Sequence, residues 1–266
     1  MLVVLAGTIP RNLLFAANLR YGTSVPWAVP ITGAYLWFFW RYPRGDGAPA
    51  STSAERRESL RANRVSPRAW VHALLAGGLG IVALVLALRV ANRIVVLPEQ
   101  RLPEFAGISR FTVLTLLLAA APIAGLVEEA AFRGYMQGPI EKRLGLSVAI
   151  LITGTMFAVA HLDFTPILWP YYVAVAAIYG TVTYLTNSIL PAIVLHTVGN
   201  LYSNLDLWVH GRAEWQAPSR SAGSFGLHGL ERSFWLDVGA FAIVFTATIL
   251  AFLFLSRLAR RGQAAV

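Results

Sequence analysis

Three apolar segments of the chain each carry polar or aromatic side chains spaced one helical turn apart. These positions are, in chain order, Glu128, Glu129, Arg133, Phe157, His161, His196 and Asn200. A charged group inside a bilayer costs at least ~2.5 kcal/mol, so such groups usually face a protein interior or a wet cavity. We therefore expect the three segments to share one polar site.

The two adjacent glutamates are expected to play different parts. Residues four apart share a face of a helix, so Arg133 can pair with Glu129 and neutralise it. Glu128 projects about 100° away onto a neighbouring face and has no local partner. A buried pair that only locks helices together explains Glu129 and Arg133 equally well. It does not explain Glu128, which is the candidate general base.

The chemistry that fits this set is hydrolysis of a carbonyl compound. Glu128, assisted by His161, is predicted to deprotonate a water molecule for attack on the carbonyl carbon. His196 and Asn200 would donate hydrogen bonds to the developing oxyanion. The alternative is a zinc site, in which Glu128, His161 and His196 ligate Zn²⁺ and a metal-bound water is the nucleophile.

Composition places these segments in a membrane. The chain has 266 residues, of which 56% are hydrophobic and 13% are charged, about half the charged share of a soluble domain. Its net charge of +9 does not indicate nucleic-acid binding, because the arginines lie between apolar runs and near the C-terminus. Cysteine is absent, which excludes a disulfide, a thiol nucleophile and a Cys-ligated zinc.

The hydrophobic pattern predicts an all-α, polytopic transmembrane bundle of about eight spans. The candidate spans are residues 2–18, 24–40, 69–90, 111–137, 146–162, 166–186, 188–205 and 233–256. We interpret 1–110 as N-terminal spans with a basic loop at 41–68, 111–205 as the catalytic core, and 206–266 as an extracytoplasmic loop and a final span. The soluble stretch 43–67 is expected to be disordered.

Loop charges give an orientation. Arginines concentrate in 41–68 and after 256, so both regions are expected in the cytoplasm, together with both termini. Counted from the cytoplasmic boundary, Glu128 and His196 then lie at matching depths of roughly 10 Å. His161 comes out deeper, unless its helix is short or tilted.

Other intramembrane hydrolase patterns do not occur in the chain. It contains no H-E-x-x-H, no G-x-S-G and no G-x-G-D. The ordered set Glu128-Glu129-x-x-x-Arg133, Phe157-x-x-x-His161 and His196-x-x-x-Asn200 resembles the CAAX protease and bacteriocin-processing (Abi) family of intramembrane peptidases. Type II CAAX prenyl endopeptidases are among its members. The resemblance covers residues 111–205.

The resemblance implies an endopeptidase of the glutamic or the metal-dependent type. In it Glu128 and His161 would activate water, and His196 and Asn200 would stabilise the oxyanion, with Glu129, Arg133 and Phe157 in supporting positions. It favours a site without a cofactor, with zinc as the alternative. The expected partners are the lipid bilayer and a membrane protein or lipidated peptide as substrate.

The sequence is also compatible with two other functions. A non-catalytic scaffold or immunity protein could keep the same fold and bind a partner. A proton-coupled transporter could use the Glu/His cluster as a relay, although no internal repeat is visible in the sequence. The location expected for all three is an integral protein of a bacterial inner membrane.

Overall fold

The computed structural model describes residues 2–22, 24–95, 107–161, 166–212 and 232–263. Every regular element within these ranges is a helix, and none of the described residues forms a strand. The predicted all-α class is therefore confirmed. Each of the eight predicted spans corresponds to a helix, or to part of one, with ends shifted by a few residues.

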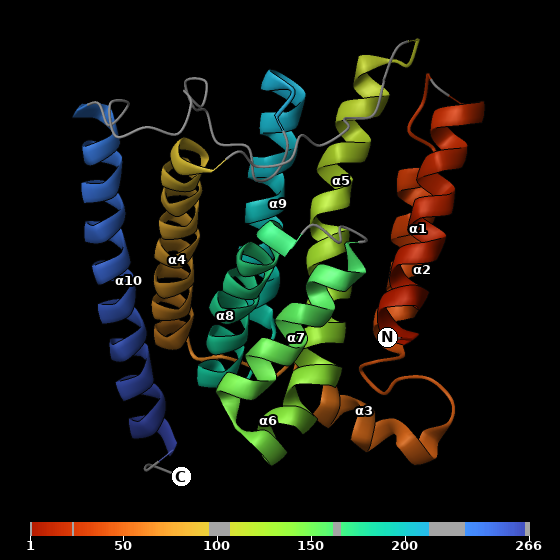
Figure 1. Cartoon of the computed structure of the whole chain (residues 1–266). Helices are drawn as coiled ribbons and strands as arrows, with labels where there is room; N and C mark the ends of the chain where they lie inside the picture. The colour runs from red at the N-terminus through yellow and green to blue at the C-terminus, as the bar shows by residue number, and fades with distance from the viewer. Residues whose placement is uncertain (1, 23, 96–106, 162–165, 213–231, 264–266) are drawn as a thin grey trace.

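The helices form one bundle with a central group and two flanking pairs (Figure 1). α1 (Leu2–Tyr21) and α2 (Ala28–Arg41) flank one side, and α4 (Pro67–Ile94) and α10 (Arg232–Gln263) flank the other. Between them, α5 (Arg110–Glu128) packs against α9 (Leu190–His210). The central group also contains α7 (Leu146–Ala160) and α8 (Trp169–Thr186), which pack against each other.

The helix that carries the glutamates changes its winding at the glutamates themselves. α5 ends at Glu128, and the chain continues without a break as a π-helix, η2 (Glu129–Gln137), and then as α6 (Gly138–Leu144). A π-helix is rare and is frequently found at functional sites, because its wider turn redirects side chains. The end of η2 is held by Gln137, which is fully buried and donates a hydrogen bond from Nε2 to the carbonyl oxygen of Gly180.

α7 is too short to cross a bilayer by itself. Its 15 residues rise about 22 Å at 1.5 Å per residue, against a hydrocarbon core of about 30 Å. It begins beside α6 and stops well below the end of the bundle where α9 ends (Figure 1). His161 directly follows its last helical residue. His161 nevertheless lines the same cavity as Glu128 and His196, so the expected difference in depth does not separate the three residues.

The expectation that residues 43–67 are disordered is wrong. This stretch contains η1 (Ala50–Thr52) and α3 (Ser53–Leu60), and α3 packs against η2. Leu60 and Arg61 are buried, and Arg61 Nη1 lies 3.0 Å from Glu141 Oε1 on α6. Gly134 of η2 permits this close packing, because a Cβ there would lie 3.0 Å from the carbonyl oxygen of Leu60. Composition alone could not reveal these long-range contacts.

Four of the described helical segments are long and apolar enough to cross a membrane: Leu2–Tyr21, Pro67–Ile94, Arg110–Leu144 and Arg232–Arg261. α2 and α7 are too short for this criterion, and α8 and α9 are too polar. The count of eight spans stays a prediction. The start of α1, the end of α10, α3 and α6 lie toward the same end of the bundle (Figure 1), an arrangement consistent with the basic segments sharing one side of a membrane.

Candidate active site

A buried hydrogen-bonded cluster joins η2 to α9. Oε1 of Glu129 lies 3.2 Å from Nη1 of Arg133 and 2.7 Å from Nδ1 of His196. The side chains of Glu129 and Arg133 are both 0% exposed. The expected pairing of Glu129 with Arg133 is present, but the bond from His196 to the same oxygen was not anticipated. Because an ionised carboxylate only accepts hydrogen bonds, Nδ1 of His196 carries the proton.

Three aromatic rings enclose the guanidinium of Arg133. Its Cζ lies 5.0 Å from the ring centroid of Phe157, 5.5 Å from that of Tyr179 and 5.9 Å from that of Phe132. Cation–π attraction of this kind is strongest where water is excluded. These rings compensate for sparse hydrogen bonding of the guanidinium. Among the described residues, its one polar contact is the salt bridge to Glu129. Phe157 therefore stabilises the charge that holds Glu129 in place.

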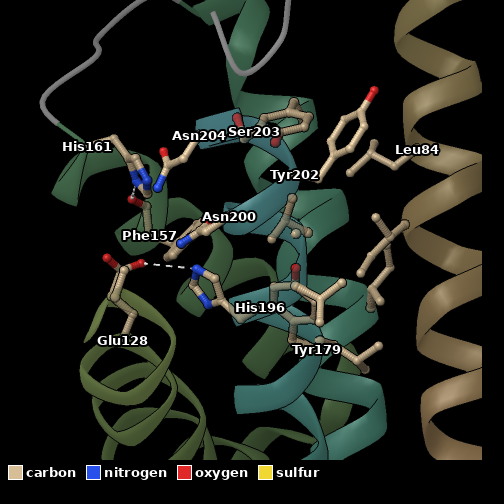
Figure 2. A pocket seen from close by; sticks show the side chains of 18 of the residues that line it. Leu84, Glu128, Phe157, His161, Tyr179, His196, Asn200, Tyr202, Ser203 and Asn204 are labelled. Atoms are coloured by element: carbon tan, nitrogen blue, oxygen red, sulfur yellow. Dashed lines mark hydrogen bonds and ion pairs between the residues drawn. The ribbon is translucent and has the colours of Figure 1, made fainter. Parts of the chain in front are cut away.

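Glu128 points the other way, into a cavity. Its side chain is 18% exposed, and Oε2 lies 3.7 Å from Nε2 of His196 (Figure 2). That distance is too long for a direct hydrogen bond, so the two groups are placed to bind a bridging water between them. His196 thus stands between the two glutamates, with one ring nitrogen directed at each.

His161 approaches the cavity from the end of α7. Its Nδ1 lies 2.8 Å from the carbonyl oxygen of Phe157, one turn earlier. A carbonyl oxygen can only accept, so Nδ1 carries the proton and Nε2 of the neutral ring carries a lone pair. The ring is held by Phe157 and Tyr172, both with centroids 4.6 Å from its own. This arrangement leaves Nε2 as a base or hydrogen-bond acceptor.

The cavity has a volume of about 1150 Å³ and lies between the central helices, α1 and α4. Glu128, Phe157, His161, His196 and Asn200 all line it, and Figure 2 shows the labelled polar side chains gathered around one space. Asn200 lies one turn beyond His196 on α9. Glu129 and Arg133 do not line the cavity but lie behind it. The opposite wall comes from α4 and is mostly apolar, with Leu74, Ile81, Val85 and Leu88 among its residues.

Sequence reasoning missed the tyrosines of α8. The ring of Tyr179 lies 5.2 Å from that of His196 at an interplanar angle of 21°, and Tyr172 lies beside His161 as described above. The two tyrosines are seven residues apart, so they occupy the same face of α8 two turns apart. That spacing was a usable signal. Arg11 and Asn12 of α1 and Ser203 and Asn204 of α9 also line the cavity and were not singled out.

The residues that would hold a zinc ion are Glu128, His161 and His196. Among the described residues, no group of three or more His, Cys, Asp or Glu side chains is placed to hold a metal ion. Nδ1 of His161 and Nδ1 of His196 are both engaged by oxygens of the protein, so Nε2 is the ring nitrogen of each that could bind a metal ion. Zinc ligation would need Glu128, His161 and His196 to converge to about 2 Å from a single point.

The comparison with known families agrees with the geometry. Residues 110–202 match the family described as type II CAAX prenyl endopeptidase, Rce1-like. These residues form an Rce1-like domain. It contains every motif residue, from Glu128 to Asn200, so the resemblance drawn from the motifs is confirmed. No curated protein and no solved structure matches the chain significantly.

The Rce1-like family is a peptidase family. Together with the long apolar helices, the Rce1-like domain indicates an integral membrane protein. The domain holds α5, η2, α6, α7, α8 and most of α9. These are the elements that supply Glu128, His161, His196 and Asn200 to the cavity.

Proposed function

We propose that this protein is an intramembrane endopeptidase that hydrolyses a peptide bond of a membrane-associated substrate. The observation that carries the proposal is the convergence of Glu128, His161, His196 and Asn200 on one cavity within the Rce1-like domain. The cavity is large enough for a peptide segment, since ligand sites usually occupy about 300–1,000 Å³. Its apolar α4 wall suits the hydrophobic part of a membrane substrate.

Glu128 is the proposed general base. It is the carboxylate of the pair that reaches the cavity, and it has no direct ion pair with an arginine among the described residues. A water held between Glu128 and Nε2 of His161 would lose a proton to Glu128 as it attacks the substrate carbonyl. The same carboxyl group can then return the proton to the leaving amine.

His196 and Asn200 are the proposed oxyanion donors. With Nδ1–H given to Glu129, His196 donates from Nε2 only as an imidazolium. That charge is compensated locally, because Glu128, Glu129, Arg133 and a protonated His196 sum to zero net charge. Buried charges persist when they are balanced in this way. The amide Nδ2 of Asn200, one turn along α9, supplies a second donor to the same oxyanion.

The proposed reaction involves no metal ion. The protein oxygens that engage both Nδ1 atoms fix the orientation of each histidine for proton transfer and hydrogen-bond donation, but the same arrangement also occurs in histidines that ligate a metal through Nε2. Elemental analysis of detergent-purified protein tests this point. Near-stoichiometric zinc that is lost in both His161→Ala and His196→Ala would require the metal-dependent mechanism instead.

The experiment that tests the function compares cleavage products in cells. Cells expressing wild type, Glu128→Gln, His196→Ala or Glu58→Gln are analysed by mass spectrometry of the new termini of membrane proteins. Glu58 is the matched control, because this acid is 74% exposed on α3, outside the cavity. We expect a set of termini with wild type and Glu58→Gln that is lost in the other two variants. Identical termini in all four samples would exclude an endopeptidase. Recovery of the same bound partner protein with all four would then support a scaffold.

A further inference from the structure

Arg11 lies in the middle of an apolar helix. It stands at the midpoint of α1, whose 20 residues otherwise form a candidate membrane span. An arginine at the centre of a spanning helix costs about 2.5–3.5 kcal/mol even on insertion scales. Such a residue is retained where it faces a cavity or a partner. Arg11 has no part in the proposed catalytic mechanism, so its position in a membrane helix needs another explanation.

The guanidinium of Arg11 lacks the acidic partner that other arginines in apolar helices possess. Arg133 pairs with Glu129, and Arg89 of α4 lies 2.9 Å from Asp237 of α10. Arg11 instead donates from Nε and Nη2 to Oδ1 of its neighbour Asn12, at 3.0 Å and 2.7 Å. Among the described residues, no carboxylate lies within 4.0 Å of it and Nη1 has no acceptor. One edge of the guanidinium is therefore available.

Arg11 faces the same cavity as the proposed catalytic residues. Val4, Thr8 and Arg11 follow one another at helical spacing along the face of α1 that lines it. α1 approaches α5 closely at Gly7, where any side chain would collide with Val127, the residue before Glu128. A helical side chain leans toward the N-terminus of its helix, so Arg11 leans back toward the level of this contact. Glu128 lines the same cavity as Arg11.

We propose that Arg11 is a substrate-binding residue that receives a carboxylate of the substrate through the available edge of its guanidinium. A planar guanidinium and a carboxylate match each other in bidentate geometry. The pairing would neutralise both charges inside the cavity. The carboxylate belongs either to the C-terminus of the substrate or to an acidic side chain. The inference rests on the proposed function only in taking the cavity as the substrate site.

A second role for Arg11 makes a different prediction. If Arg11 acted only on the charge of Glu128, its loss would affect catalysis in the same way for every substrate. It would not discriminate a ligand with a carboxylate from the same ligand with an amide. Binding measured without any cleavage step therefore separates the two roles.

The test measures binding of three probes to the detergent-purified full chain by the shift in thermal unfolding midpoint. The probes are N-dodecanoyl-glycine, its carboxamide, and the α-amide of N-dodecanoyl-aspartic acid, which share one apolar tail. The proteins are wild type, Arg11→Gln, Arg11→Lys and Arg20→Gln. Arg20 is the matched control, because it lies in the last turn of the same helix, is exposed over the ring of Tyr21 and does not line the cavity.

We expect at least one of the two acids to bind wild type and Arg20→Gln about tenfold more tightly than the amide, which corresponds to about 1.4 kcal/mol. The difference should vanish in Arg11→Gln and persist in part in Arg11→Lys, which keeps the charge. A preference for the terminal acid or for the side-chain acid identifies the source of the carboxylate. Equal shifts with all three probes in wild type, no shift with any of them, or an acid preference that survives in Arg11→Gln would overturn the proposal.

The outcome is independent of catalysis. Acid-selective binding that depends on Arg11, in a protein that generates no new termini in cells, would support this inference and reject the peptidase. New termini that depend on Glu128, without acid-selective binding, would support the peptidase and reject this inference.

Discussion

Nδ1 of His196 lies 2.7 Å from Oε1 of Glu129, the same oxygen that pairs with Arg133. The second motif glutamate is therefore more than the partner of an arginine on its own helix. It orients the imidazole that faces Glu128, and it does so from a position that water does not reach. The two adjacent glutamates differ in burial, and their roles differ accordingly. Glu129, at 0% exposed, orients His196, whereas Glu128, at 18% exposed, faces the cavity.

This relationship predicts distinct effects for the two ends of the buried pair. Arg133→Ala should lower the free energy of unfolding by about 3–5 kcal/mol, because it removes the positive partner of Glu129 and leaves an excess negative charge buried in the cluster. Glu129→Gln should lower the free energy of unfolding by less, because glutamine still accepts a hydrogen bond. It nevertheless leaves the charge of Arg133 without its carboxylate partner. The double variant Glu129→Gln/Arg133→Met should recover part of the loss. Thermal unfolding in detergent measures all three, and additive losses in the double variant would contradict the pairing.

Phe157 should matter more for turnover than for stability. Its ring contacts Arg133 as well as both histidines, with centroids 4.6 Å from His161 and 6.1 Å from His196. Phe157→Leu keeps an apolar side chain of similar size, for which core swaps usually cost less than about 1.5 kcal/mol. It removes the ring that orients the two imidazoles, so turnover should fall while KM changes little.

The matched control for Phe157→Leu is Phe234→Leu. Phe234 is 6% exposed near the start of α10 and does not line the cavity. It should show a similar loss of stability without a loss of turnover. Equal losses of turnover in both variants would show that Phe157 acts through packing alone.

The position of α7 depends on a close helix contact at Gly154. A Cβ there would lie 3.0 Å from Cα of Val173 and 3.1 Å from Cβ of Ala176, both on α8. Gly154→Ala should therefore push α7 from α8, lower the free energy of unfolding by about 1–3 kcal/mol and displace His161. Gly33→Ala is the control, because nothing lies within 4 Å of a Cβ at that position. A Gly154→Ala variant as stable and as active as Gly33→Ala would contradict the packing.

The packing of α3 and the following Arg61 should depend on the buried ion pair between Arg61 and Glu141 and not on the exposed pair between Glu58 and Lys142. Arg61 and Glu141 have side chains only 10% and 12% exposed, whereas Lys142 and Glu58 are 71% and 74% exposed. Arg61→Ala should cost about 3–5 kcal/mol, as expected when one partner of a buried pair is removed. Lys142→Ala should have little effect, because exposed pairs contribute little. Thermal unfolding of the two variants side by side checks the difference.

The exposed pair also has a defined pH dependence. The hydrogen bond and charge of Lys142 lower the pKa of Glu58. The small contribution of this pair to stability is present above the usual pKa of glutamate. It is lost as the pH falls through the lowered pKa of Glu58. Titration of Glu58 by NMR should therefore show a lower pKa in wild type than in Lys142→Ala, and equal values would exclude the pair in solution.

Local spacing in the sequence was sufficient to predict several features. The lengths of the apolar runs predicted where the spanning helices lie. The four-residue spacing of Glu129 and Arg133 predicted their pairing. The same reasoning gave Glu128 a different face, which is the face that meets the cavity. These features depend on neighbours within one or two helical turns, which a single sequence displays directly.

Features that depend on distant contacts could not be predicted. The bond from Glu129 to His196 joins residues 67 positions apart, and no local pattern encodes it. The order of residues 50–60 follows from packing of α3 against η2, not from their polar composition. The predicted span at 146–162 matches α7 to within two residues, but whether so short a helix crosses the membrane depends on its surroundings, which apolarity alone does not reveal.

The most direct test of the account is single-turnover cleavage by purified protein in lipid nanodiscs, with a substrate identified from the termini lost in cells. Wild type is compared with Glu128→Gln and with Glu58→Gln, after all three have been shown to have the same helical content and unfolding midpoint. We predict that Glu128→Gln loses at least about 10²-fold in the rate of bond cleavage, the usual contribution of a general base, whereas Glu58→Gln cleaves like wild type. Cleavage by folded Glu128→Gln at the wild-type rate would contradict the central claim that Glu128 activates the attacking water.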